Sequence, residues 1–160
     1  MRLKRVQNVY IKKTHYKQET AFSCIPACVR MVLEFHSIVM REAELRAKFK
    51  TKSYGTHIVN LLNLNHESYG IQTKIDFWSI AELKEFLQKF QTPCITLIRT
   101  EFLKHWESKC SHAVVVVGFD DEHIIVNDPY FDEKEFRIPF DDFTNAWQIN
   151  DGVVITIVAE

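Results

Sequence analysis

The sequence predicts an α+β fold, in which helices come first along the chain and an antiparallel sheet follows. Up to residue 91, apolar residues recur at helical spacing. Beyond residue 91 the chain changes to short β-branched runs bounded by Asp, Asn and Gly. With 46% apolar side chains, only 4 Gly and 4 Pro, and no linker or repeat, residues 1–160 are predicted to form a single domain with a sizeable core.

The first half contains four predicted helices. In the first, Ile25, Cys28, Val29 and Val32 lie on one face, and Pro26 stands just inside the helix, where its missing N–H costs little. The other three are rich in helix-forming residues and are separated by glycines. The four predicted helices span residues 24–35, 40–50, 56–70 and 79–90.

The second half contains the predicted strands, and one short helix at 139–147 interrupts them. That helix carries Phe140, Phe143 and Trp147, which are expected to pack beneath the sheet. A helical layer on one face of the sheet leaves room for a cleft between the two layers. The predicted strands span residues 92–99, 112–119, 123–128, 134–138 and 152–159.

Composition excludes several functional classes. The net charge is −1, and basic residues form no stripe that could follow a nucleic-acid backbone, so no nucleic-acid partner is expected. No apolar run is long enough for membrane insertion, and the basic start, residues 1–18, is not followed by an apolar signal core. The chain is therefore predicted to be cytoplasmic, with its 4 cysteines present as free thiols.

Cys24 stands at the start of the first predicted helix. Its sulfur would face the positive end of the helix dipole, which favours the thiolate form that a nucleophile needs. Cys28 follows one helical turn later and is expected to pack in the core.

A nucleophilic thiol also needs a general base, a group that orients the base, and donors for an oxyanion. His112 begins the strongest strand and could serve as the base, while Asp128 ends the next strand and could orient it. Gln18 precedes Cys24 and could supply an amide N–H as an oxyanion donor beside the backbone N–H of Cys24. The sequence therefore predicts a catalytic site of Cys24, His112, Asp128 and Gln18.

Strand parity selects Asp128 over its neighbour Asn127 as the partner of His112. If residues 120–122 form the hairpin loop, Phe119 lies opposite His123, and His112 and Asp128 then share one face of the sheet. Asn127 points to the other face. A one-residue slip of the register would reverse this choice.

This set of residues resembles a known family. Gln18 before a helix-leading Cys24, then "SHAVVVVGFD", "IIVNDP" and "DDFTNAW", is similar to the papain-like cysteine peptidases of the bacteriocin-processing type, cysteine peptidase family thirty-nine. The resemblance covers about residues 10–158. It implies a papain-like fold, no metal or organic cofactor, and cleavage of leader peptides after a double glycine.

The resemblance assigns Cys24 as nucleophile, His112 as general base and acid, Asp128 as its orienter and Gln18 as oxyanion donor. The chain departs from the family in having Ser23 and Ile25 on either side of the cysteine, where an acidic residue and a glycine are usual. Well-known members are fused to an ATP-driven membrane transporter, whereas this sequence has neither a membrane segment nor a nucleotide-binding loop. Together with the resemblance, this difference implies a standalone peptidase that acts on a peptide or protein, with a separate exporter or a peptide precursor as partner.

Two other interpretations remain open from the residues. The same fold could be a catalytically silent peptide-docking module, or Cys24, Cys28, Cys110 and His112 could bind zinc. The zinc interpretation leaves Gln18 and Asp128 without a role. Residues 100–111, with Phe102, Leu103 and Trp106, are expected to form a wall or lid of the cleft, and the remaining histidines, His105 among them, are expected at the surface.

Overall fold

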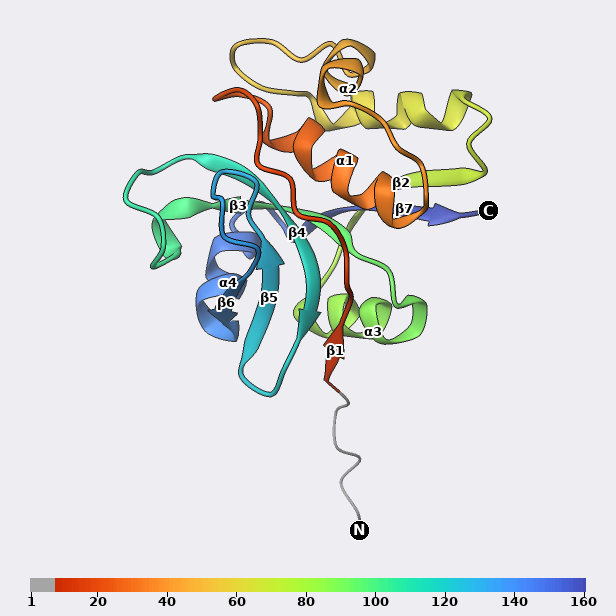
Figure 1. Ribbon diagram of the computed structural model, residues 1–160. Coiled ribbons are helices and arrows are strands. Elements are labelled where there is room, and N and C mark those ends of the chain that lie inside the picture. The colour runs from red at the N-terminus through yellow and green to blue at the C-terminus, as the bar shows by residue number, and fades with distance from the viewer. Residues whose placement is uncertain (1–7) are drawn as a thin grey trace.

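The computed structural model describes residues 8–160 and confirms the predicted α+β fold. An antiparallel sheet with the strand order β2-β7-β3-β4-β5-β6 forms its centre, and β1 pairs with the far end of β4 (Figure 1). Residues 1–7, part of the basic start considered above, lie outside the described residues.

The helices begin and end close to the predicted positions. They are α1 (Cys24–Phe35), α2 (Glu42–Lys48), α3 (Ile80–Phe90) and α4 (Phe140–Gln148), with 3-10 segments η1 (Ile58–His66) and η2 (Thr100–Phe102). The strands are β1 (Val9–Tyr10), β2 (Ile71–Phe77), β3 (Cys94–Arg99), β4 (Ser111–Phe119), β5 (His123–Asn127), β6 (Phe136–Pro139) and β7 (Val153–Ala159).

Strand β2 was missing from the prediction, which expected only helices before residue 91. It pairs with β7 along its whole length, from Ile71 opposite Ala159 to Phe77 opposite Val153. Its residues 71, 73, 75 and 77 alternate with more polar ones, which is the period of a half-buried strand. The alternation is short and lies between two helical segments, so it does not stand out in the sequence.

Segment η1 is a 3-10 helix, where an α-helix over 56–70 was expected. Its asparagine side chains bond to backbone groups outside the segment. Asn60 donates to the carbonyl of Phe49, and Asn65 both donates to and accepts from the backbone of Thr73. Asparagine competes in this way with regular helical hydrogen bonding.

Helices cover both faces of the sheet, so the expectation of a helical layer on one face is wrong in part. Helix α1 packs on the face that carries Ala113 and Val115, together with α2 and η1. Helices α3 and α4 pack on the opposite face, where Phe143 and Trp147 are fully buried as predicted. The candidate cleft lies on the α1 side.

The β4–β5 hairpin has a different register at its turn from the one predicted. Phe119 lies opposite Ile124 rather than His123, because Asp120 and His123 close a longer loop. The register then shifts between Val116 and Gly118, so that Val116 faces Val126, as the prediction requires. This β-bulge restores the predicted parity at the end of the hairpin where His112 and Asp128 lie.

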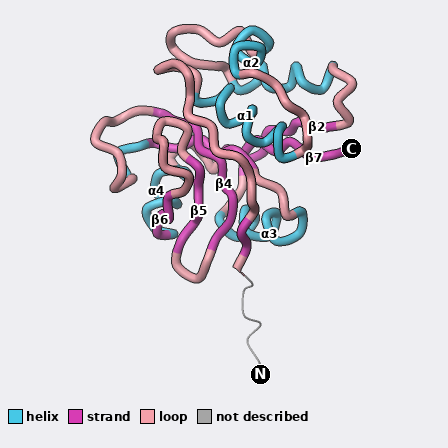
Figure 2. Tube along the Cα trace, in the orientation of Figure 1, coloured by secondary structure: helices cyan, strands magenta, loops and turns pink. Residues whose placement is uncertain are grey.

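A long loop, residues 11–23, connects β1 to α1 and runs along the sheet (Figure 2). The N–H of Ile11 donates to the carbonyl of Val117, and the N–H of Gln18 donates to the carbonyl of Pro129. A side chain at Gly118 would collide with the carbonyl of Val9, so the close approach of β1 requires glycine there. The loop thereby delivers Gln18 next to Asp128.

Within residues 8–160, none of the helices is long and apolar enough to cross a membrane.

Candidate active site

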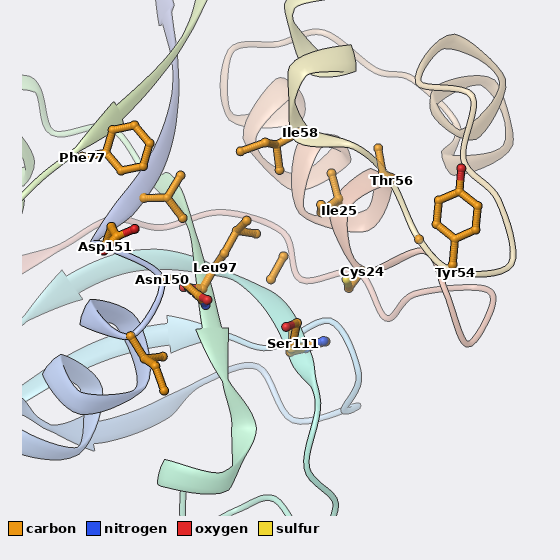
Figure 3. Close-up of a pocket in the computed structure, with 15 residues that line it drawn as sticks. Cys24, Ile25, Tyr54, Thr56, Ile58, Phe77, Leu97, Ser111, Asn150 and Asp151 are labelled. Carbon is orange, nitrogen blue, oxygen red and sulfur yellow. Dashed lines mark hydrogen bonds between the residues drawn. The ribbon is translucent and has the colours of Figure 1, made fainter.

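Side chains from separate elements meet where α1 begins. Cys24 is the first residue of α1, His112 is the second residue of β4, and Asp128 directly follows β5. Figure 3 shows the Cys24 side chain facing Ser111 of β4 across the cleft. The structure thus brings Cys24, His112 and Asp128 together from distant parts of the chain.

His112 stands between the thiol and the carboxylate. Its Nε2–H donates to Asp128 Oδ1 at 2.6 Å, and His112 and Cys24 line the same two hollows. The residue is only 6% exposed. Burial lowers the pKa of His112, but the interactions with Asp128 and Cys24 outweigh it and raise the pKa to about 9. The imidazole therefore carries its second proton at neutral pH.

Asp128 is fully buried and accepts hydrogen bonds on both oxygens. Oδ1 accepts from His112 and from the backbone N–H of Tyr130 at 3.1 Å. Oδ2 accepts from His105 Nε2 at 3.0 Å and from Trp106 Nε1 at 2.8 Å. Burial raises the pKa of Asp128, but the donors from His105, His112 and Trp106 overcome this effect and hold the pKa well below its usual value.

The sequence did not reveal that His105 and Trp106 both bond to Asp128. His105 was expected at the surface, but its ring stacks on Phe136, with centroids 4.0 Å apart, and bonds to Asp128. Trp106 was expected in a cleft wall, and its ring does lie 4.8 Å from that of His112. Its bond to Asp128 depends on how the 100–111 segment folds back, which no local pattern predicts.

Gln18 lies beside the thiol, in the loop before α1. Gln18 and Cys24 line the same pocket. The Gln18 Nε2 donates one hydrogen to the carbonyl of Thr20 at 2.8 Å, and its second amide hydrogen is available for a bound group. Its Oε1 is buried and has no hydrogen-bond partner among the described residues.

Asn127 faces away from His112, toward α1. Its Nδ2 donates to His15 Nδ1 at 3.2 Å and lies 3.9 Å from Met31 Sδ. Successive residues of the strand thus point to opposite faces, and Asp128, rather than Asn127, reaches the imidazole.

Two hollows adjoin the thiol. The larger, about 480 Å³, runs from Cys24 and His112 across β3 and β7 to Phe77 of β2. It has an apolar lining (Figure 3): Ile25, Ile58, Phe77, Leu97, Ala113 and Val153. The smaller, about 250 Å³, lies on the side of Gln18 and Trp106, and Tyr54 and Gly55 line both. An extended peptide could therefore enter on one side of Cys24 and leave on the other.

The described residues, 8–160, hold no group of three or more His, Cys, Asp or Glu side chains arranged for a metal ion. Cys28 is fully buried in the core on the α1 side. The zinc interpretation of Cys24, Cys28, Cys110 and His112 therefore has no site in this part of the chain.

Iodoacetamide is expected to alkylate Cys24 before the other thiols near neutral pH. Cys28 and Cys94 are fully buried, and burial raises the pKa of both thiols. Cys110 is partly exposed but has Thr100, not a histidine, beside its sulfur. Mass spectrometry after a brief reaction measures the order, and labelling of Cys110 ahead of Cys24 would contradict the nucleophile assignment.

The helix-on-sheet arrangement, with a thiol at the helix start and a histidine on a strand lining the same cleft, is that of the papain-like class of folds. The sequence profile of the Peptidase C39 family matches residues 12–160, so this chain belongs to that family. No curated protein sequence matches it significantly.

Solved structures of the same fold agree with this assignment. A double glycine motif protease from an AMS/PCAT transporter, in complex with the leader peptide, is 22% identical with a TM-score of 0.72, over 96% of this chain and 99% of that one. A putative C39-like peptidase from Bacillus anthracis is 18% identical with a TM-score of 0.79, over 96% and 98%. The peptidase domain of Streptococcus ComA, a bifunctional ABC transporter of a quorum-sensing pathway, is 21% identical with a TM-score of 0.68, over 91% and 97%.

Proposed function

We propose that this chain is a cysteine peptidase that cleaves peptide bonds with Cys24, His112, Asp128 and Gln18. The observation that carries the proposal is the position of His112, which lines the same hollows as Cys24 and is hydrogen-bonded to the buried Asp128. A nucleophile, an acid–base group and an orienting carboxylate in this order form the arrangement needed for acyl transfer.

Cys24 begins the reaction by attacking a peptide carbonyl. The thiolate forms a bond to the carbonyl carbon, and the carbonyl oxygen becomes an oxyanion. As this tetrahedral intermediate breaks down, His112 gives its proton to the leaving amine, and a thioester to Cys24 remains. A pKa of about 9 suits this step, because His112 holds the proton at neutral pH.

Water then releases the acyl group. Neutral His112 takes a proton from water, the resulting hydroxide attacks the thioester, and the thiolate leaves as the imidazolium forms again. Asp128 stays ionised throughout, fixes the ring through Nε2 and stabilises its positive charge. The cycle requires no metal or organic cofactor.

The oxyanion needs donors that are already in place. The free amide hydrogen of Gln18 belongs to a side chain that lines the same hollow as Cys24, and the backbone N–H of Cys24 lies at the start of α1, where the helix dipole also favours negative charge.

The proposed substrate is a precursor whose leader ends in a double glycine. A double glycine motif protease with its leader peptide has the same fold. Glycines let the peptide backbone approach Cys24 beneath Tyr54 and Gly55, since they carry no side chain. The apolar floor between Leu97 and Phe77 could take apolar side chains of the leader.

Synthetic leader peptides with Gly-Gly or Val-Val before the scissile bond test this proposal. We expect cleavage after the second glycine, little cleavage of the Val-Val peptide, loss of activity with iodoacetamide and no loss with a chelator. Mass spectrometry of the products identifies the cleaved bond. Binding of the Gly-Gly peptide without any cleavage would support the docking module instead.

Gln18→Ala is expected to lower kcat by about 10²- to 10³-fold, as is typical when one oxyanion donor is removed. KM and the melting temperature should change little, because within residues 8–160 the side chain makes a single hydrogen bond, to Thr20 of the same loop. Steady-state kinetics with one peptide measure the effect. An unchanged kcat would show that Gln18 does not contact the reacting carbonyl.

A further inference from the structure

A buried carboxylate lies directly behind the loop that carries the proposed oxyanion donors. Glu42 is the first residue of α2 and is only 1% exposed. A buried charge is costly unless it is fully hydrogen-bonded and paired, so its contacts indicate what it stabilises.

One oxygen of Glu42 holds the loop. Oε1 accepts from the backbone N–H of Glu19 at 3.0 Å, and it shares the hydroxyl hydrogen of Ser23, at 3.2 Å, with the carbonyl of Thr20. Glu19 directly follows Gln18, and Ser23 directly precedes Cys24. The carboxylate is thus hydrogen-bonded to the neighbours of Gln18 and Cys24, the two residues whose N–H groups would bind the oxyanion.

The other oxygen of Glu42 pairs with Arg46, one helical turn along α2. Arg46 Nη1 donates to Oε2 at 2.7 Å. The guanidinium cancels the charge of the carboxylate, so a negative group can lie near a developing oxyanion with little repulsion. Ser23 connects the two parts of the loop, since its Oγ also accepts from the N–H of Thr20.

We propose that Glu42 is a positioning residue of the peptidase, which holds Gln18 and the N–H of Cys24 at the spacing that the oxyanion requires. It touches neither the thiol nor the imidazole by any hydrogen bond of the structure, and acts through Glu19 and Ser23. The inference rests on the proposed function and adds a residue to it.

Glu42→Gln tests this role while preserving size. A carboxylate accepts hydrogen bonds on both sides, but a carboxamide accepts on one only, so either Arg46 or the pair of loop donors loses its acceptor. We expect kcat to fall about 10- to 100-fold, since a small misplacement of reacting groups can cost about 10²-fold. KM should change less than about threefold.

Glu44→Gln is the matched control on the same helix. Glu44 pairs with Arg41 at the surface, and among residues 8–160 its side chain makes no hydrogen bond or ion pair with the loop. It should retain the kcat of the unmodified protein. Equal kcat values for Glu42→Gln and Glu44→Gln would overturn the inference.

A double-mutant cycle distinguishes positioning from general damage. If Glu42 acts through the oxyanion donors, Glu42→Gln should cost less than about threefold in kcat once Gln18→Ala is present. Alkylation of Cys24 by iodoacetamide, which forms no oxyanion, should change less than about threefold in Glu42→Gln. The proposal is contradicted if the two substitutions lower kcat independently of each other, or if the rate of Cys24 alkylation falls sharply in Glu42→Gln.

Hydrogen exchange supplies a readout that needs no peptidase activity. The amide of Glu19 should exchange at least about tenfold faster in Glu42→Gln than in Glu44→Gln, because it loses its acceptor. If the unmodified protein cleaves no peptide, the proposed function fails, while unchanged exchange at Glu19 overturns the role of Glu42. Should Glu42→Gln not fold, Ser23→Ala removes one of the two loop contacts and should lower kcat in the same direction.

Discussion

Cys24→Ala is expected to abolish peptide cleavage, with a loss in kcat of about 10⁶-fold, the scale seen when the nucleophile of an acyl-transferring triad is removed. Without the sulfur no thioester can form, and His112 has no nucleophile with which to exchange a proton. Timed peptide digests followed by mass spectrometry, at high protein concentration, give enough range to measure such a loss.

Cys28→Ala is the control for this variant. Cys28 lies one turn further along the same helix and is fully buried, so its loss should cost roughly 1 kcal/mol of stability through a small cavity. Its kcat should be unchanged. Equal losses in the two variants would point to damage to α1 rather than removal of a nucleophile.

Peptide binding should survive in Cys24→Ala, because the apolar floor of the cleft is untouched. Isothermal titration with the uncleaved Gly-Gly peptide measures this. Cleavage by Cys24→Ala at the rate of the unmodified protein would exclude Cys24 as the nucleophile and contradict the proposed mechanism.

Local patterns predicted most of the fold. Helix α3 has both its apolar face and a capping box, in which Ser79 and Glu82 exchange hydrogen bonds, and both can be read directly from the sequence. The β-bulge after Val116 could not be predicted, since it depends on how β1 crosses β4 at Gly118. The predicted shared face of His112 and Asp128 nevertheless holds, because the bulge offsets the wrong register at the turn.

The candidate site was only partly predictable, for a physical reason. Cys24, His112 and Asp128 each stand at the end of a helix or strand, where a sequence pattern marks them. His105, Trp106 and Glu42 take their places through contacts between segments far apart in the chain. A histidine in an irregular segment and a glutamate in an amphipathic helix look like surface residues until the tertiary structure is known.

Asp128→Ala is expected to lower kcat by about 10⁴-fold, which is the scale of altering the orienting carboxylate of a triad. His112 loses its acceptor at 2.6 Å, so its ring is no longer held toward Cys24, and its pKa should fall from about 9 because Asp128 no longer opposes the effect of burial. The alkaline limb of the pH–rate profile should therefore move to lower pH. His105 and Trp106 also lose their acceptor, so stability should fall by about 1–3 kcal/mol.

The pH dependence of that stability loss has a definite sign. The raised pKa of His112 contributes stability that is complete below its ordinary value of 6.5 and is lost as pH rises through about 9. The depressed pKa of Asp128 contributes above its ordinary value of 3.8. The difference in unfolding free energy between the unmodified protein and Asp128→Ala should thus be largest between pH 3.8 and pH 6.5, and it should shrink as the pH rises through about 9.

Asn127→Ala separates orientation of the imidazole from stability. Asn127 points to His15 and Met31 on the α1 side, so its removal should destabilise the protein by about 1–3 kcal/mol while kcat stays within about threefold at a temperature where the variant is folded. Urea unfolding and steady-state kinetics on both variants, with one peptide, make the comparison. Loss of activity in Asn127→Ala with normal turnover in Asp128→Ala would contradict the assignment, because only a carboxylate on the His112 face can hold the proton-carrying ring against the thiol.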